Sequence, residues 1–181
     1  AAFIAMPGHK GLYGPQGTGI LLCGRMPESL LEGGTGSLSA LAQMPDFLPD
    51  GAEAGTQNVT GIHALSAGLE FIRSRGERAI FDHEVRLRQL LAAALRELPG
   101  AQVWEGAPQT GVLSVSLRNE DCEQTAQRLA EHDIAVRAGL HCAPLAHESA
   151  GTLETGTVRF SFSAFNTERQ VLKAAEVLRM R

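Results

Sequence analysis

The sequence predicts an α/β chain in which a glycine-rich segment is followed by a small α+β domain with an antiparallel sheet. Three observations support this prediction: two short apolar runs near the start, two helical repeats of apolar residues in the middle, and alternating strand patterns after residue 101. The chain has 181 residues, of which 44% are hydrophobic, so it is long enough to bury a core.

The first two expected elements are short strands joined by a glycine-rich loop. Residues 1–6 (AAFIAM) and 19–24 (GILLCG) are apolar runs, and each is interpreted as a buried strand. The loop between them contains His9 and Lys10. The segment from residue 25 to residue 58 is rich in Gly, Pro and Ser and lacks periodicity, which indicates a long functional or interfacial loop.

Two helices are expected next, in residues 60–76 and 77–98. One apolar face of the first helix is formed by Ile62, Leu65, Leu69 and Ile72. In the second helix, leucines recur at three- or four-residue steps from Leu87 to Leu98 and charged residues fill the other face. Gly76 can close the first helix, and a Pro-Gly pair ends the second.

The last third of the chain alternates strands and helices. We expect strands at 101–106, 111–119, 134–138 and 156–165, and helices at 121–133 and from 167 onward. Val158 and Phe160 alternate with Arg159, as in a strand with one covered face. Thr167 and Gln170 have the spacing of a capping box, which predicts where the terminal helix begins.

Composition excludes several classes of function. The net charge of −4 comes from interspersed charges, so no basic surface for nucleic acid is expected. No apolar run is long enough to cross a membrane and the start lacks a signal peptide, which predicts a cytoplasmic protein with no membrane partner. Cys23, Cys122 and Cys142 are an odd number without CxxC spacing, so neither a disulfide framework nor a zinc site is indicated.

Lys10 is the first candidate for chemistry. Most lysines are solvated surface charges, but this one lies in a loop between two apolar runs, among glycines that let the backbone approach a ligand. The loop matches neither the phosphate-binding P-loop nor the dinucleotide fingerprint. A partly desolvated lysine at this place would favour the neutral amine, which is the nucleophile for a Schiff base.

Cys142 and Arg159 are the other candidates. Cys142 lies in an expected loop with Gly139, Pro144 and two histidines, shortly after Arg137, and positive neighbours favour a reactive thiol over a buried structural one. His141, Cys142 and His147 do not match a zinc pattern, so no metal is assigned. Arg159 is on the polar face of its strand, where it could bind a substrate carboxylate or form an ordinary salt bridge.

Five blocks of the sequence resemble the class V, cysteine desulfurase-like group of pyridoxal-phosphate enzymes. They occur in the order of that family and are GHKGLYGPQGTG (8–19), EGGTGS (32–37), EAGTQN (53–58), RAGLHCAPLAH (137–147) and TGTVRFSFSAFNT (155–167). The resemblance implies the C-terminal part of a PLP-dependent transferase large domain in residues 1–75, with the lysine loop and a dimer-interface loop, followed by the small α+β domain in residues 76–181.

The resemblance also implies a role for each candidate residue. Lys10 would bind the aldehyde of pyridoxal 5'-phosphate covalently, and His9 would help to hold the phosphate. Thr56 would reach the phosphate of the neighbouring subunit, so the protein would be a homodimer. The substrate carboxylate would be bound by Arg159, with Arg137 as a weaker contributor. Cys142 would take sulfur from L-cysteine as a persulfide and pass it to an acceptor protein.

The expected activity is therefore that of a cysteine desulfurase, which converts cysteine to alanine in sulfur metabolism. In the family, the aspartate that pairs with the cofactor nitrogen and the aromatic residue on its ring precede the lysine, where this sequence has nine residues. We expect a chain that is N-terminally truncated and inactive by itself. The alternatives are a class V aminotransferase, epimerase or β-lyase with a structural Cys142, or a non-catalytic fragment that only dimerises or binds a partner.

Overall fold

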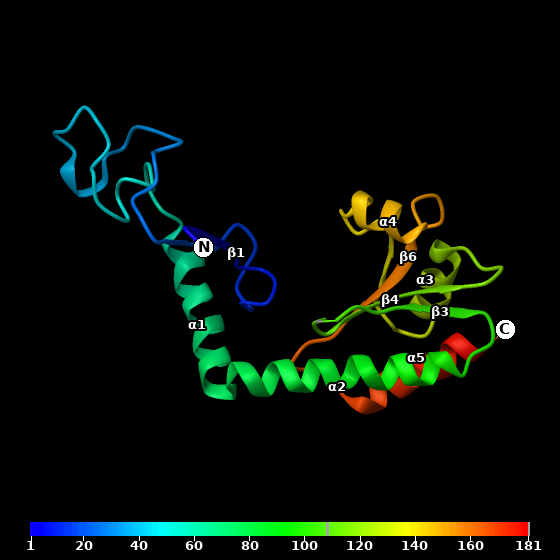
Figure 1. The fold of residues 1–181 in the computed structure, drawn as a ribbon. Coiled ribbons are helices and arrows are strands. Elements are labelled where there is room, and N and C mark those ends of the chain that lie inside the picture. The colour runs from blue at the N-terminus through cyan, green and yellow to red at the C-terminus, as the bar shows by residue number, and fades with distance from the viewer. Residues whose placement is uncertain (108, 181) are drawn as a thin grey trace. The chain divides into compact units, whose positions relative to one another are not determined.

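The computed structural model describes residues 1–107 and 109–180, which form two compact units (Figure 1). Unit 1 comprises residues 1–76 and unit 2 residues 77–181. The elements occur in the order β1, β2, η1, α1 in unit 1, followed by α2, β3, β4, α3, β5, α4, β6, α5 in unit 2. The predicted mixture of helices and antiparallel strands is confirmed.

Unit 1 begins with an antiparallel hairpin. Strand β1 (Phe3–Pro7) pairs with β2 (Gly19–Cys23) in a register that places Phe3 opposite Cys23 and Pro7 opposite Gly19. The strands are where the sequence predicts them, but the prediction that they are buried is wrong, because the described residues supply no layer that covers them. Apolar side chains such as Ile4 and Leu22 remain about half exposed.

Helix α1 (Val59–Arg75) comes after the long loop in the sequence and packs against the loop of the β1–β2 hairpin. The Asn58 side chain caps it by accepting a hydrogen bond from the Gly61 amide at 3.0 Å, and Gly76, with φ 86°, ends it. The face that is buried consists of Gly61, Leu65 and Gly68, whereas Ile62 and Leu69 are exposed. The expected inward face of this helix is therefore wrong at both of those residues.

The long segment between β2 and α1 is irregular, as predicted, apart from the 3₁₀ turn η1 (Gly36–Leu38). Polar contacts close it across its length. Ser29 donates to the Gly51 carbonyl at 2.6 Å, and Ser37 donates through its hydroxyl to Asp50 at 2.6 Å. These hydrogen bonds from Ser37 lower the pKa of the Asp50 carboxyl, since they favour the charged form.

Unit 2 contains a four-stranded antiparallel sheet with the order β3-β4-β6-β5. The strands are β3 (Ala101–Trp104), β4 (Val112–Leu117), β5 (Arg137–Gly139) and β6 (Thr157–Ser161). All four strands are shorter than the sequence predicts, and β5 begins three residues later than expected. The register places Ser114 of β4 opposite Arg159 of β6, and Arg159 opposite Arg137 of β5, so these three residues form one row across the sheet.

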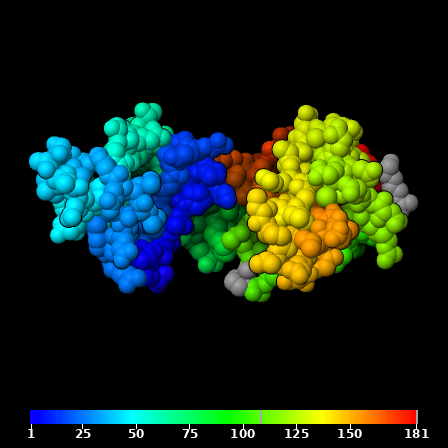
Figure 2. Space-filling view, turned by 90° about the horizontal axis from the view of Figure 1, so that it is seen from above, coloured from blue at the N-terminus to red at the C-terminus, as the bar shows by residue number. Residues whose placement is uncertain are grey.

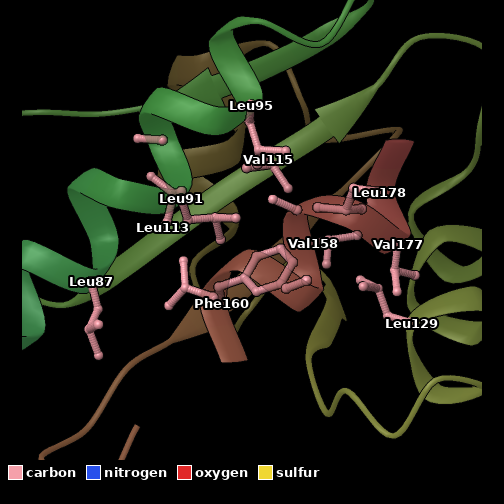
Figure 3. Packing of buried hydrophobic residues seen from close by; sticks show 14 residues of the cluster. Leu87, Leu91, Leu95, Leu113, Val115, Leu129, Val158, Phe160, Val177 and Leu178 are labelled. Carbon is pink, nitrogen blue, oxygen red and sulfur yellow. The ribbon is translucent and has the colours of Figure 1, made fainter. Parts of the chain in front are cut away.

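The helices of unit 2 are α2 (Glu77–Arg96), α3 (Cys122–Ala130), α4 (Pro144–Ala150) and α5 (Glu168–Arg179). The core lies between one face of the sheet and helices α2, α3 and α5, and α4 contributes no residue to it. Figure 3 shows leucines of α2 directed toward Leu113 and Val115 of β4 and toward Phe160. Leu87, Leu91 and Leu95 are fully buried, as their predicted helical spacing requires.

Two features of unit 2 bear directly on the sequence predictions. The capping box of α5 is confirmed, because Thr167 accepts from the Gln170 amide and Gln170 binds the Thr167 amide in return. Helix α4 was not expected from the sequence. Its seven residues follow Cys142 directly in a segment interpreted as loop, because the segment is too short for an apolar repeat to stand out.

Candidate functional site

The candidate residues fall into two groups, one in each unit. His9, Lys10 and Thr56 belong to unit 1, and Arg137, Cys142 and Arg159 belong to unit 2. Each group is described within its own unit.

Lys10 lies at the tip of the β1–β2 hairpin, in a loop that is closed by backbone hydrogen bonds. The Gly8 amide donates to the Thr18 carbonyl at 2.8 Å, and the Gly14 amide donates to the Gly8 carbonyl at 2.8 Å. A tight turn inside the loop is formed by the Tyr13 amide and the Lys10 carbonyl, at 3.0 Å. The backbone that carries Lys10 is therefore fixed at several points.

The lysine loop packs against α1 at glycine residues of that helix. A Cβ atom at Gly68 would lie 2.3 Å from the Leu12 carbonyl oxygen, so only glycine lets the loop approach the helix so closely. The Tyr13 ring adds an edge-to-face contact with Phe71, with 5.1 Å between the ring centroids. Lys10 is thus presented from a loop that packs on the backbone of α1.

The side chains of His9 and Lys10 are exposed. The expectation that Lys10 is partly desolvated is therefore wrong for the described chain, since the loop packs through Leu12, Tyr13 and Gly14 and leaves the amine outside that contact. A primary amine and an imidazole next to each other at an exposed hairpin tip remain accessible to a ligand.

Thr56 is exposed next to a contact between two of the glycine-rich segments. The Gly55 amide donates to the Gly34 carbonyl at 3.1 Å, and a Cβ at Gly34 would lie 2.7 Å from the Gly55 Cα. Gly34 and Gly55 have φ values of 59° and 80°, which glycine adopts without strain. The segments 32–37 and 53–56, far apart in sequence, are thereby held side by side.

In unit 2, two guanidinium groups lie on neighbouring strands. Arg137 and Arg159 are paired residues in the β5–β6 register, and Arg159 Nε donates to the Ser161 hydroxyl at 3.1 Å. Within residues 1–107 and 109–180, neither arginine forms a salt bridge. Arg159 therefore does not form the ordinary salt bridge that the sequence left open. The two guanidiniums are available to bind a carboxylate together.

Cys142 follows β5 in a tight turn, and its side chain is exposed. The Ala143 amide donates to the Leu140 carbonyl at 2.9 Å, which closes a β-turn with His141 and Cys142 at its centre. Figure 2 shows the yellow to orange surface of the segment from β5 through α4 on an open face of unit 2. A thiol in this position can be reached by a small molecule or by another protein.

His141 is the residue of this site that the sequence left without a role. Burial, followed by the charges of Arg159 and His147, lowers the pKa of its imidazole below the ordinary 6.5, and a hydrogen bond to Thr157 opposes this only in part. The ring is therefore neutral at neutral pH. Position 157 falls in the alternating pattern around Arg159, which was the signal that could have pointed to this contact.

Neither a metal cluster nor the cavity of unit 2 involves the predicted site residues in the described part of the chain. Among the residues that the structure describes, no three His, Cys, Asp or Glu side chains are grouped so that they could hold a metal ion. A cavity of unit 2 is lined by residues of β3, β4, the start of α3 and the α4–β6 connection, and it contains none of the predicted site residues. No helix in the described part of the chain is long and apolar enough to span a bilayer.

Comparison with known protein families gives one clear relationship. Residues 1–173 match the family model described as aminotransferase class-V. A probable cysteine desulfurase of Methanothermobacter thermautotrophicus is 36% identical over 98% of this chain and 47% of its own length. A probable cysteine desulfurase of Pseudomonas putida is 35% identical over 97% of this chain and 44% of its own length.

Solved structures agree with the sequence relatives. An apo cysteine desulfurase from Thermococcus onnurineus NA1 has a TM-score of 0.87 and 30% identity, over 99% of this chain and 46% of that one. The cysteine desulfurase CsdA of Escherichia coli, in an S-sulfonic acid form, has a TM-score of 0.85 and 31% identity, over 97% of this chain and 45% of that one. The chain thus spans less than half the length of these relatives.

The fold expected from the resemblance, the C-terminal part of a PLP-dependent transferase, is confirmed by these structures. The family match covers both the lysine loop and the arginine and cysteine segments. This chain belongs to the class-V aminotransferase family, within which it is similar to cysteine desulfurases.

Proposed function

We propose that this chain carries the lysine, the carboxylate-binding arginines and the sulfur-accepting cysteine of a PLP-dependent cysteine desulfurase. The observation that supports it best is in unit 2. Two guanidiniums that form no salt bridge among the described residues lie on paired strands, and an exposed cysteine follows one of those strands after two residues. In this proposal residues 1–75 belong to a cofactor-binding domain and residues 76–181 to a small domain.

The residues of unit 1 fit the two reactive ends of pyridoxal 5'-phosphate. Lys10 offers an exposed primary amine for the aldehyde, and His9 offers a neighbouring hydrogen-bonding group for the phosphate. When bound, the cofactor withdraws electrons from the carbons of the amino-acid substrate. The lysine loop holds the amine on a fixed backbone, so that Lys10 can bind the cofactor and later hold or release a proton at the substrate carbon.

The side chains of unit 2 act on the substrate itself. Arg159 and Arg137 bind the carboxylate of L-cysteine and thereby orient its sulfur. The thiolate of Cys142 attacks that sulfur and forms an S–S bond. The C–S bond breaks with its electron pair left on carbon, the carbon takes up a proton, and alanine leaves while the persulfide stays on Cys142. An acceptor protein then takes the sulfur from this exposed position.

A homodimer belongs to the same proposal. Thr56 is exposed beside the paired glycine-rich segments, where its hydroxyl is free to meet the cofactor phosphate of a second subunit. Large apolar side chains of the long loop, among them Leu30 and Leu31, are also exposed and would be covered in such an assembly.

Two measurements test the proposal. Incubation with pyridoxal phosphate and borohydride should leave the reduced cofactor on Lys10, as identified by peptide mass, and not on Lys173, the chain's other lysine. In a protein that joins this chain to the cofactor contacts that precede the lysine in the family, incubation with pyridoxal phosphate and L-cysteine should leave a persulfide on Cys142. Cys142→Ser should abolish it, while Cys23→Ser and Cys122→Ser should not. Cysteine turnover that survives Cys142→Ser would instead favour a β-lyase or another class-V reaction.

A further inference from the structure

The turn that carries Cys142 has an unusual backbone. Both of its central residues have positive φ, 54° at His141 and 59° at Cys142, and the turn is closed by the hydrogen bond from the Ala143 amide to the Leu140 carbonyl. Turns with positive φ at both central positions are normally made by Gly, Asn or Asp. A histidine and a cysteine keep this conformation only where surrounding contacts hold them in it.

The His141 side chain of this turn contacts two neighbouring elements. Its Nε2 lies 3.0 Å from the hydroxyl of Thr157, a residue of β6 that is only 2% exposed. The His141 ring also lies near His147 of α4, with 5.4 Å between the two ring centroids. The Nδ1 atom of His147 lies 2.8 Å from the Thr152 hydroxyl. His141 is therefore held between β6 and α4.

The same strand carries the carboxylate-binding arginine. Thr157 and Arg159 are two residues apart on β6, and residues two apart on a strand face the same side of the sheet. Arg159 and Arg137 are also close enough to His141 to act on its charge, together with His147. A neutral His141 can lie beside the two guanidiniums without adding a third positive charge.

We propose that His141 is a positioning residue, which through its hydrogen bond to Thr157 holds the Cys142 turn in register with Arg159. The inference rests on the proposed function for the roles of Cys142 and Arg159, although the contact itself does not. The substrate carboxylate is bound at Arg159 and its sulfur must meet Cys142. A fixed distance between Arg159 and Cys142 therefore lowers the entropic cost of reaching the reactive geometry.

The test removes the hydroxyl of Thr157 from the full chain without changing its shape. Thr157→Val keeps the volume of this buried side chain, whereas Thr157→Ser keeps the hydroxyl and is the matched control. Amide hydrogen exchange of Ala143 should become at least roughly tenfold faster in the valine variant and should stay near the wild-type rate in the serine variant. Exchange of Val115, in the core strand β4, reports any global loss of stability.

A second variant separates anchoring by the side chain from backbone preference. His141→Gly suits a positive φ but cannot reach Thr157, so exchange at Ala143 should again accelerate roughly tenfold. An unchanged or slower rate in His141→Gly, or equal rates in the valine and serine variants, overturns the proposal. If Thr157→Val unfolds, His141→Gly decides the question alone.

Turnover distinguishes this inference from the function on which it rests. In a protein that joins this chain to the cofactor contacts that precede the lysine in the family, with pyridoxal phosphate and L-cysteine, Thr157→Val should lower kcat by roughly tenfold. KM should stay within about twofold, because Arg159 stays in place. A loosened turn with unchanged kcat shows that His141 does not position the thiol for the reaction. If that protein with the wild-type residues releases no alanine, the proposed function fails, while the exchange rates still report on the contact between His141 and Thr157.

Discussion

Units 1 and 2 differ in how they are stabilised. In the described residues, unit 2 contains fourteen buried hydrophobic side chains that form a single cluster, whereas the only buried hydrophobic residue of unit 1 is Leu65. Unit 1 is held by close glycine contacts, hairpin hydrogen bonds and polar links across a long loop. The difference teaches that Arg137, Arg159 and Cys142 lie on a unit with its own hydrophobic core, while Lys10 lies on a unit whose apolar side chains are largely exposed.

The largest expected effect comes from separating the two units. Residues 77–181 alone should unfold cooperatively in urea, because their core is complete. Residues 1–76 alone should show no cooperative transition, because they bury too little apolar surface to offset the loss of chain entropy. Circular dichroism during a urea titration measures both, and a sharp transition in residues 1–76 would break the comparison.

Truncating a leucine in each unit should have unequal effects. Leu91 is fully buried in α2, so Leu91→Ala should lower the free energy of unfolding of unit 2 by about 2–5 kcal/mol. Leu22 of β2 is 51% exposed, so Leu22→Ala should change the free energy of unfolding by no more than about 0.5 kcal/mol. An equal loss of unfolding free energy in the two variants, measured by urea titration, would show that unit 1 also has a hydrophobic core.

Glycine substitutions sharpen the description of unit 1. Gly68→Ala gains about 0.5–1 kcal/mol of helix propensity, but its Cβ would lie 2.3 Å from a backbone oxygen of the lysine loop, and such overpacking costs about 1–3 kcal/mol. The loop should therefore loosen, with faster amide exchange at Gly14. Gly11→Ala is the control in the same loop, because its Cβ would meet nothing within 4 Å. Slower amide exchange at Gly14 in Gly68→Ala would show that the loop does not pack closely against Gly68.

The smallest expected effect is the pH dependence contributed by His141. Its pKa in the folded protein lies below the ordinary 6.5, so the unfolded chain binds more protons below that pH. The contribution of His141 to stability is complete above 6.5 and is lost as the pH falls. Unfolding free energies of wild type and His141→Gln should therefore diverge as the pH rises toward neutrality, and an imidazole pKa above 6.5 by NMR would contradict this.

The sequence predicted unit 2 better than unit 1, for a physical reason. Apolar periodicity reports burial against a core in the same chain, so the spacing from Leu87 to Leu95 and the alternation around Val115 located the core of unit 2. In α1 the buried face consists of Leu65, which the apolar spacing predicted, and of Gly61 and Gly68, which carry no hydrophobic signal. The hairpin strands were located correctly, but their apolar character did not report contacts within this chain.

The candidate site was predictable only as a list of residues. Alternation placed Arg159 on the polar face of β6, but the register that sets Arg137 opposite it depends on long-range pairing that no local pattern encodes. The contact between His141 and Thr157 was missed for a similar reason, since its hydrogen bond joins residues sixteen positions apart. The assignments of His9, Lys10, Thr56, Arg137, Cys142 and Arg159 remain proposals.

The pairing of Arg137 with Arg159 has a consequence for the stability of the β5–β6 strand pair. Like charges directly opposite each other weaken a pair of strands, and in the described chain no carboxylate offsets them. An anion that binds both guanidiniums would offset this repulsion. By linkage, a bound carboxylate should tighten the β5–β6 edge of the sheet and so act as a structural counterion.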